Sequence, residues 1–326
     1  MLAVAYYAIS VADVPPRVTT TLWKLGLFVV AVIGIAGFGH LLTDVFDVAE
    51  DRTSGRENAW DRMGWAQRVA VFAALIAASW LPWVLLPIGV VGLGLVAVEF
   101  LLFAVYAIPP VRLKERGLGG VVADGLYAHA VPVLVTWLAF SRAAAVATPW
   151  WLGALLGAWA LAVGMRHLLQ HQANDMERDR QAGVATYAVR HGRTRTLQLI
   201  VERLLPVEAV VFLGLVAVFG LREPLVAVGF VAYVMWETFK LRVLWLEPMY
   251  PFGRLELNDR ADILGTRLSS RFYERWLPVL MLLGLVLRSP EYLVLLAVHL
   301  AVFTNGLGDL VRHDLPLALA HRRRAR

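Results

Sequence analysis

The chain has 326 residues, of which 59% are hydrophobic and 17% are charged, and its mean hydropathy is +0.63. This composition excludes an ordinary soluble domain, in which about a quarter of the residues are charged. The chain has no cysteine, which excludes disulfides, thiolate nucleophiles and Cys-ligated metal sites. Its net charge of +6 could suggest nucleic acid, but in a membrane protein with several spans the distribution of basic residues matters more than their sum, and we expect no nucleic-acid partner.

Ten apolar segments follow one another along the chain, and most have the length of roughly 17–25 residues that a transmembrane helix needs. They cover residues 1–13, 21–43, 66–86, 88–107, 121–140, 147–171, 198–220, 223–246, 273–288 and 290–308. The long connections between them are rich in arginine and alternate with short, nearly uncharged ones. The positive-inside rule places the long connections in the cytoplasm. We therefore expect an all-α integral membrane protein of the bacterial inner membrane, with its active site facing the cytoplasm.

An acidic cluster stands at the end of the second apolar segment, in the stretch HLLTDVFDVAEDRTSGREN at residues 40–58. Asp44, Asp47 and Asp51 are spaced by three and four residues, so they share one face if the helix continues. Like charges stacked in this way repel one another, and Mg²⁺ relieves such repulsion while it holds substrate phosphates. A solvated helix end would give the same pattern.

A second acidic cluster matches the first. Asp175 and Asp179 lie one helical turn apart at the end of the sixth segment, and His171 continues their face into the membrane. When Asp47 is aligned with Asp175, both stretches read D-x-x-x-D-R-x-x-G. This repeat predicts one transmembrane domain over residues 1–326, with pseudo-equivalent halves at about 1–120 and 121–246 and C-terminal helices at 273–308. Two carboxylate pairs could hold metal ions with a diphosphate between them.

A basic stretch, YAIPPVRLKERGLGG, follows the fourth segment at residues 106–120. Pro109 and Pro110 end the helix, and Arg112 and Lys114 then lie on the same side of the membrane as the acidic clusters. Such cations neutralise a departing diphosphate. The alternative is that they only fix the topology.

Together these segments resemble the UbiA superfamily of intramembrane prenyltransferases, over about residues 20–200. The first family motif, N-D-x-x-D-x-x-x-D, is matched except that Thr43 replaces the leading asparagine. The second motif, D-x-E-x-D-R-x-x-G-x-x-T, and the third, Y-x-x-P-P-x-R-x-K, are matched by Asp175, Glu177, Asp179, Arg180, Gly183 and Thr186, and by Tyr106, Pro109, Pro110, Arg112 and Lys114.

The resemblance implies a UbiA-like bundle of nine transmembrane helices, or ten here, around a central cavity. It implies that Mg²⁺ is held by Asp47, Asp51, Asp175 and Asp179 with Asp44 in support, and that the diphosphate is bound by Lys114, Arg112, Arg180 and Tyr106. Further candidate site residues are Thr43, Asn174, His171 and Glu99. Glu99 lies within the fourth segment, where a charge is costly and often functional; a pair with Arg166 is the alternative.

The activity that the resemblance implies is Mg²⁺-dependent transfer of an isoprenyl group from an isoprenyl diphosphate to a lipophilic acceptor taken from the membrane, aromatic acceptors included. A membrane terpene cyclase of the same superfamily, which needs no acceptor, fits the same aspartates. A transporter or lipid-binding membrane protein is the alternative of another class, although acidic clusters at helix ends favour a phosphate site over transport at the bilayer midplane.

Overall fold

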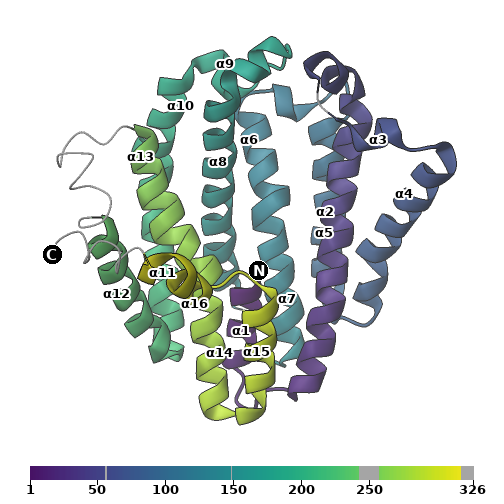
Figure 1. Ribbon diagram of the computed structural model, residues 1–326. Coiled ribbons are helices and arrows are strands. Elements are labelled where there is room, and N and C mark those ends of the chain that lie inside the picture. The colour runs from purple at the N-terminus through teal and green to yellow at the C-terminus, as the bar shows by residue number, and fades with distance from the viewer. Residues whose placement is uncertain (56, 148, 242–256, 317–326) are drawn as a thin grey trace. The chain divides into compact units, whose positions relative to one another are not determined.

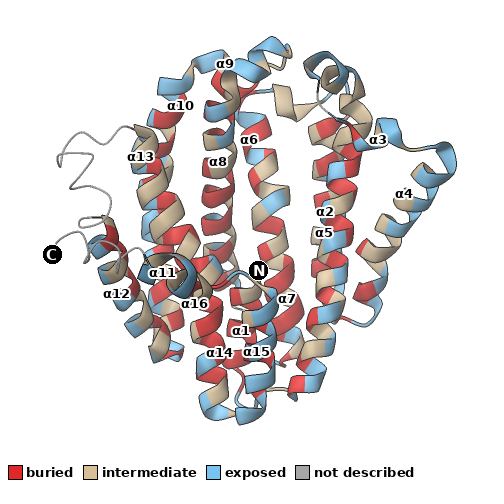
Figure 2. Ribbon diagram, in the orientation of Figure 1, coloured by how far each residue is buried: buried red, intermediate tan, exposed pale blue. Residues whose placement is uncertain are grey.

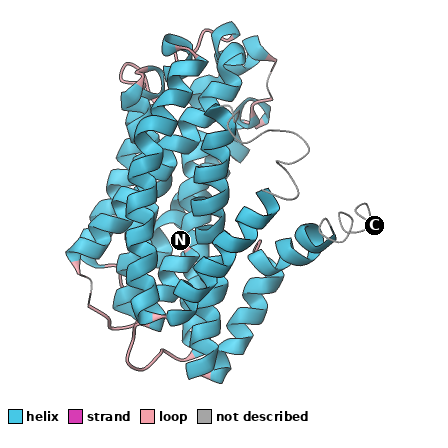
Figure 3. Ribbon diagram, turned by 90° about the vertical axis from the view of Figure 1, so that its left-hand side faces the viewer, coloured by secondary structure: helices cyan, strands magenta, loops and turns pink. Residues whose placement is uncertain are grey.

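The computed structural model describes residues 1–55, 57–147, 149–241 and 257–316, and these residues form helices joined by turns and loops, without a strand (Figure 3). The all-α prediction is therefore confirmed. Within these described ranges, six helices are long and apolar enough to cross a membrane, or seven if the bent pair Pro290–Val302 and Gly306–Arg312 is one span. This number indicates an integral membrane protein but does not confirm the predicted nine to ten spans.

The chain forms two compact units. One of them covers Thr19–Val207 and carries every residue of the three sequence motifs. Its helices, shown in Figure 1, are α2 (Val18–Ser54), α3 (Ala59–Arg62), α4 (Trp65–Trp80), α5 (Gly89–Ala107), α6 (Leu118–Gly125), α7 (Val131–Ala143), α8 (Trp150–Gln181), α9 (Tyr187–His191) and α10 (Arg193–Leu199). We call it the motif unit.

Both acidic clusters lie on helices that continue past the apolar segments, as predicted. α2 ends at Ser54 and α8 ends at Gln181, so each helix extends beyond its aspartates. The glycine of each D-x-x-x-D-R-x-x-G stretch then follows, Gly55 with φ +70° and Gly183 with φ +75°. This left-handed conformation ends a helix and favours glycine, which has no Cβ. The repeated glycine therefore lies four residues after the second aspartate at the end of both helices.

Close packing of α2 on α4 depends on Gly34. A Cβ at this position would lie 2.5 Å from the backbone nitrogen of Ser79 and 2.7 Å from the carbonyl carbon of Ala78. Small residues allow helix backbones to approach in this way within membranes. α8 is likewise buried along one face, visible in red in Figure 2, and it packs against α6. These contacts fix the two helices that carry the aspartates.

The other unit comprises Met1–Val18 and Glu208–Arg326. Its helices are α1 (Leu2–Ser10), most of α11 (Leu205–Arg222), α12 (Pro224–Phe239), α13 (Leu257–Ala261), α14 (Leu277–Arg288), α15 (Leu293–Val302) and α16 (Gly306–Asp309). α1 has nine residues, of which eight are buried, and it packs on α14. At about 1.5 Å per residue, nine residues are too short to cross a bilayer. The predicted first span is thus a short buried helix.

The predicted polar connection at 247–272 is partly wrong. Residues 257–276 are helical and lead directly into α14, while residues 247–256 lie outside the described part of the chain. The charged residues of this stretch hide the helix in a hydropathy reading, yet Arg267 forms an ion pair with Asp262 at 3.1 Å and Ser269 donates a hydrogen bond to Glu208. The predicted break at Pro290 is confirmed, because α14 ends at Arg288 and α15 begins at Leu293.

Candidate active site

The motif unit contains a polar cavity of about 620 Å³ at the carboxyl ends of α2 and α8. Eight of the predicted site residues line it: Thr43, Asp47, Asp51, Tyr106, Lys114, His171, Asp175 and Asp179. The structure therefore brings aspartates of both acidic clusters and the lysine of the basic stretch to one cavity.

The two helices contribute to the cavity with the same spacing. Five residues of α2 line it, and adding 128 to each residue number gives five lining residues of α8. These sets are His40, Thr43, Asp47, Glu50 and Asp51 on α2, and Leu168, His171, Asp175, Arg178 and Asp179 on α8. Steps of three and four residues keep each set on one helix face. The repeat seen in the sequence thus places side chains in equivalent positions along both helices.

Asp47 is the centre of an ion-pair cluster. Its Oδ1 atom lies 2.5 Å from Lys114 Nζ and 3.1 Å from Arg112 Nη2. Glu50 contacts the same two cations, and Arg112 Nε also lies 2.5 Å from Glu115 Oε1. Only 11% of the Lys114 side chain and 15% of the Asp47 side chain are exposed, so these charges are much less hydrated than surface pairs.

The backbone holds Arg112 in an uncommon conformation. Its φ is +38°, which is unfavourable for a residue with a Cβ. Its amide donates to the carbonyl of Ile108 at 3.0 Å, and the ion pairs of its guanidinium add to this anchor. Unfavourable backbone conformations of this kind persist where the surrounding contacts over-determine them, often at functional sites.

The other carboxylates have different partners. Asn58 donates to Asp51 Oδ2 at 2.8 Å and to the carbonyl of Asp44 at 2.9 Å, which ties the loop after α2 to the acidic cluster. Asp175 lies 3.2 Å from His171 Nδ1 and 3.6 Å from Arg178 Nη1. The Thr43 hydroxyl, in place of the family's asparagine, donates to the carbonyl of Gly39 at 3.0 Å.

Two tyrosines form part of the cavity wall. The rings of Tyr106 and Tyr127 are 5.2 Å apart in an edge-to-face arrangement, and the Tyr127 hydroxyl donates to Asp124 Oδ1 at 2.6 Å. Phe103, which does not line the cavity, packs on Tyr127 with ring centroids 4.6 Å apart. The two tyrosine rings give the wall an aromatic part beside its charged side chains, and a ligand with an anionic head and an apolar tail fits such a lining.

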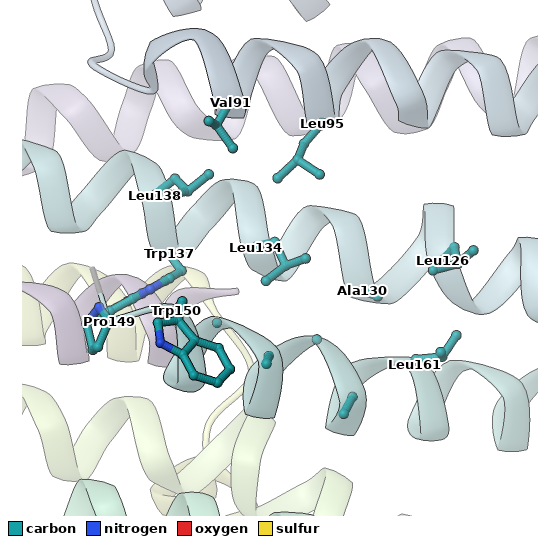
Figure 4. A pocket seen from close by; sticks show the side chains of 14 residues that line it. Val91, Leu95, Leu126, Ala130, Leu134, Trp137, Leu138, Pro149, Trp150 and Leu161 are labelled. Carbon is teal, nitrogen blue, oxygen red and sulfur yellow. The ribbon is translucent and has the colours of Figure 1, made fainter.

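A second cavity of about 540 Å³ lies between α5, α7 and α8 and has an apolar lining (Figure 4). Leu134, Trp137 and Leu95 flank it, and Gly153 and Gly157 line it on α8. No ionisable side chain lines it. Of these two cavities, the polar one therefore suits a diphosphate and the apolar one does not.

Comparison with known proteins agrees with this arrangement. Residues 1–247 match the sequence model of the UbiA prenyltransferase family, which is more than half of the chain. The chain belongs to this family. The match extends beyond the motif-bearing segment of about 20–200 on which the resemblance rested.

Curated relatives in the family are lycopene elongase/hydratases of haloarchaea. The protein of Haloarcula japonica is 29% identical over 187 residues, which cover 57% of this chain and 60% of the relative. Those of Haloferax volcanii and Halobacterium salinarum are 30% and 33% identical and cover 53% and 58% of this chain, with 54% and 69% of the relatives. The match thus spans less than two thirds of the first two relatives.

Solved structures of a UbiA homologue from Archaeoglobus fulgidus share the fold. The form bound to DMAPP and Mg²⁺ has a TM-score of 0.54 at 15% identity and covers 82% of this chain and 91% of the homologue. The form bound to GPP and Mg²⁺ has a TM-score of 0.53 at 15% identity and covers 87% of this chain and 94% of the homologue. The predicted UbiA-like fold is confirmed.

Five predicted residues do not line the polar cavity: Asp44, Glu99, Arg112, Asn174 and Arg180. Arg112 reaches it only through its pairs with the two α2 carboxylates. Arg180 turns to Glu177, at 2.6 Å, and 52% of its side chain is exposed. Asn174 is exposed, and Glu99 is 4% exposed within α5, with no ion pair to Arg166 in the described part of the chain.

Sequence reasoning missed four polar lining residues: Glu50, Tyr127, Gln172 and Arg178. Glu50 and Arg178 each follow a motif aspartate by three residues, so a position-by-position comparison of the two repeats would have found both. Gln172 accepts a hydrogen bond from the amide of Tyr187 at 3.1 Å and so ties α9 to α8. No signal in the sequence marks Tyr127.

Proposed function

We propose that this protein is a Mg²⁺-dependent intramembrane prenyltransferase that moves an isoprenyl group from an isoprenyl diphosphate to an apolar polyene acceptor. One observation carries the proposal: Asp47, Asp51, Asp175 and Asp179 line a single cavity together with Lys114. The UbiA homologue solved with DMAPP, GPP and Mg²⁺ has the same fold, which supports an isoprenyl diphosphate as donor.

The charge of the polar cavity supports the need for a divalent cation. Five carboxylates and two lysine or arginine side chains line it, which gives a formal charge of −3 with neutral histidines. A diphosphate is itself an anion and would be repelled from such a site. Divalent cations reverse this balance, and carboxylate and phosphate oxygens are the ligands that Mg²⁺ prefers.

The donor set fits Mg²⁺ as a partner shared between protein and substrate. Among the described residues, no group of three or more His, Asp or Glu side chains lies close enough to hold a metal alone. Mg²⁺ usually takes one or two carboxylates and completes its shell with phosphates and water. We assign the pair Asp47 and Asp51 and the pair Asp175 and Asp179 to this role. When bound, Mg²⁺ neutralises the diphosphate oxygens and so makes diphosphate a better leaving group.

The chain's own side chains complete the chemistry. Lys114 and Arg178 supply positive charge to the diphosphate as its bond to the isoprenyl carbon breaks and it takes the electron pair. The faces of Tyr106 and Tyr127 in the cavity wall suit the allylic cation that remains. A double bond of the acceptor then donates its electrons to this cation. The new cation on the acceptor loses a proton or takes up water, with loss of the water's proton.

The relatives named lycopene elongase/hydratase support a polyene acceptor over a phenol. They also favour transfer over acceptor-free cyclisation, because elongation needs a second substrate. The long arginine-rich connections support a position of the polar cavity at the cytoplasmic face of the plasma membrane.

The test is diphosphate release by the purified protein in nanodiscs, with DMAPP, GPP and longer isoprenyl diphosphates, with and without lycopene. We expect release that needs Mg²⁺ and lycopene, and a product heavier than lycopene by one prenyl unit or by a prenyl unit and water. Asp47→Asn and Asp175→Asn should lose at least 100-fold in rate, while Glu57→Gln, an exposed acid, should not. Release without lycopene that yields a terpene would make the protein a cyclase. No release and no binding of Mg²⁺-diphosphate would refute the proposal in favour of transport or lipid binding.

A further inference from the structure

Glu50 shares both of its partners with Asp47. One carboxylate oxygen of Glu50 contacts Arg112, and the other lies 3.1 Å from Lys114 Nζ. Asp47 Oδ1 lies 2.5 Å from Lys114 and 3.1 Å from Arg112. Each cation thus bridges the same two carboxylates, which are three residues apart on α2.

The charges in this cluster do not balance while Asp47 is part of it. Asp47, Glu50 and Glu115 carry three negative charges, and Arg112 and Lys114 carry two positive ones. Without Asp47 the cluster is neutral. A half-buried cation with no carboxylate partner is costly, so Asp47 can turn to another ligand only if Lys114 keeps a counter-ion.

We infer that Glu50 is a positioning residue that keeps Lys114 and Arg112 paired when the Asp47 carboxylate leaves them for Mg²⁺ and the diphosphate. The inference rests on the proposed function. Glu115 cannot take this role, because among its ion pairs in the described structure it reaches Arg112 and not Lys114. Lys114 pairs with Asp47 and Glu50, so Glu50 is the carboxylate that remains to it in the described part of the chain.

The equivalent position on the other helix has the opposite charge. Arg178 stands where the repeat places Glu50, and it lies 3.6 Å from Asp175. Asp175 therefore receives its cation from its own helix, whereas Asp47 receives its cations from the segment after α5. A mediating carboxylate is needed on the α2 side, because two cations from another segment are held there beside Asp47.

The first test is isothermal titration of Mg²⁺ into the full-length protein in nanodiscs with saturating inorganic diphosphate. Glu50→Gln should raise the apparent Kd for Mg²⁺ about tenfold, equivalent to about 1.4 kcal/mol. Glu115→Gln removes the same charge from the same cluster and should change Kd by less than about threefold, as should Glu50→Asp. Unchanged or tighter Mg²⁺ binding by Glu50→Gln, or equal losses in Glu50→Gln and Glu115→Gln, would overturn the inference.

A second measurement needs neither metal nor turnover. The chain has three lysines, Lys24, Lys114 and Lys240, so pulse acetylation followed by mass spectrometry reads each one separately. In metal-free protein, Glu50→Gln should speed acetylation of Lys114 about threefold relative to the other two, since the amine then leaves its ion pairs more often. Glu115→Gln should not. Unchanged Lys114 labelling in Glu50→Gln would overturn the role of Glu50. If Glu50→Gln did speed Lys114 labelling but the wild-type protein bound no Mg²⁺-diphosphate, the proposed function would be overturned instead.

Discussion

Replacing Lys114 by methionine removes the positive charge most closely held in the polar cavity. The Lys114 side chain is 11% exposed, and its Nζ atom lies within 3.1 Å of two carboxylates. The substitution keeps the side-chain length but changes the formal charge of the cavity lining from −3 to −4. The departing diphosphate then meets one cation fewer at the moment when its charge grows.

The expected loss lies in kcat. Removal of one preorganised donor from a developing anion costs about 10²–10³ in kcat, or about 2.7–4 kcal/mol. Lys114→Arg keeps the charge and should stay within about tenfold of wild type, since only the shape of the cation changes. Diphosphate release at saturating Mg²⁺ and donor measures kcat, and titration of the donor separates kcat from KM.

Two results would refute this reasoning. If Lys114→Met kept kcat within about threefold of wild type, the ammonium would have no role in leaving-group departure. If Lys114→Arg lost as much as Lys114→Met, shape and not charge would decide. Thermal unfolding of both variants with and without Mg²⁺ is the folding control.

Three further comparisons test the fold and the site. Gly34→Ala should lower the free energy of unfolding by about 1–3 kcal/mol, because its Cβ would lie 2.5 Å from a backbone nitrogen of α4; Gly26→Ala, with nothing within 4 Å, should be neutral or stabilising in the same thermal unfolding assay. Arg178→Gln should reduce diphosphate release more than about tenfold and Arg180→Gln less than about threefold, since only Arg178 lines the cavity; equal losses would contradict the assignment. Hydrogen bonds from Arg52 on α2 lower the pKa of Asp61 below the usual value for an aspartate. The ion pair therefore stabilises the fold at pH values above that usual pKa, and this stabilisation is lost as the pH falls through the lowered pKa of Asp61. Asp61→Asn should therefore flatten the acid side of the Tm against pH curve, and an unchanged curve would show that the pair adds no stability.

Much of the fold could be predicted because apolar segments with sharp ends leave little choice. The predicted span 88–107 is α5, Gly89–Ala107, and the span 66–86 matches the helical stretch Trp65–Val84. Two expectations failed for identifiable reasons. α1 is apolar because it is buried within its unit, not because it spans the membrane. The helix at 257–276 is charged because its charged side chains form ion pairs inside the same unit. A hydropathy profile cannot distinguish a buried helix or a charge-paired helix from a membrane span or a solvated loop, because it holds no information on which residues are in contact.

The site was predictable where the sequence repeats and unpredictable where contacts cross between elements. The aspartates could be identified because their spacing occurs twice, and a repeated spacing can be read directly from the sequence. The pairing of Asp47 with Lys114 joins residues 67 apart, and the conformation of Arg112 that supports it depends on a left-handed backbone. The sequence could therefore predict that the motif aspartates gather with Lys114. It did not predict Glu50 or Arg178, and it could not predict which charges neutralise each other.

That pairing explains how one cluster can serve two states of the protein. Half-buried carboxylates need counter-ions before any substrate arrives, and Lys114 and Arg112 supply them. When Mg²⁺ and a diphosphate bind, the aspartates pair with Mg²⁺ and the lysine pairs with the diphosphate. The resting ion pairs are thus replaced by new ones, and the number of paired charges does not fall. The cost of breaking the resting pairs is then offset by the pairs that form, and it is smallest if Lys114 never loses its last carboxylate. Glu50 is placed to ensure this, which links the stability of the empty site to its affinity for substrate.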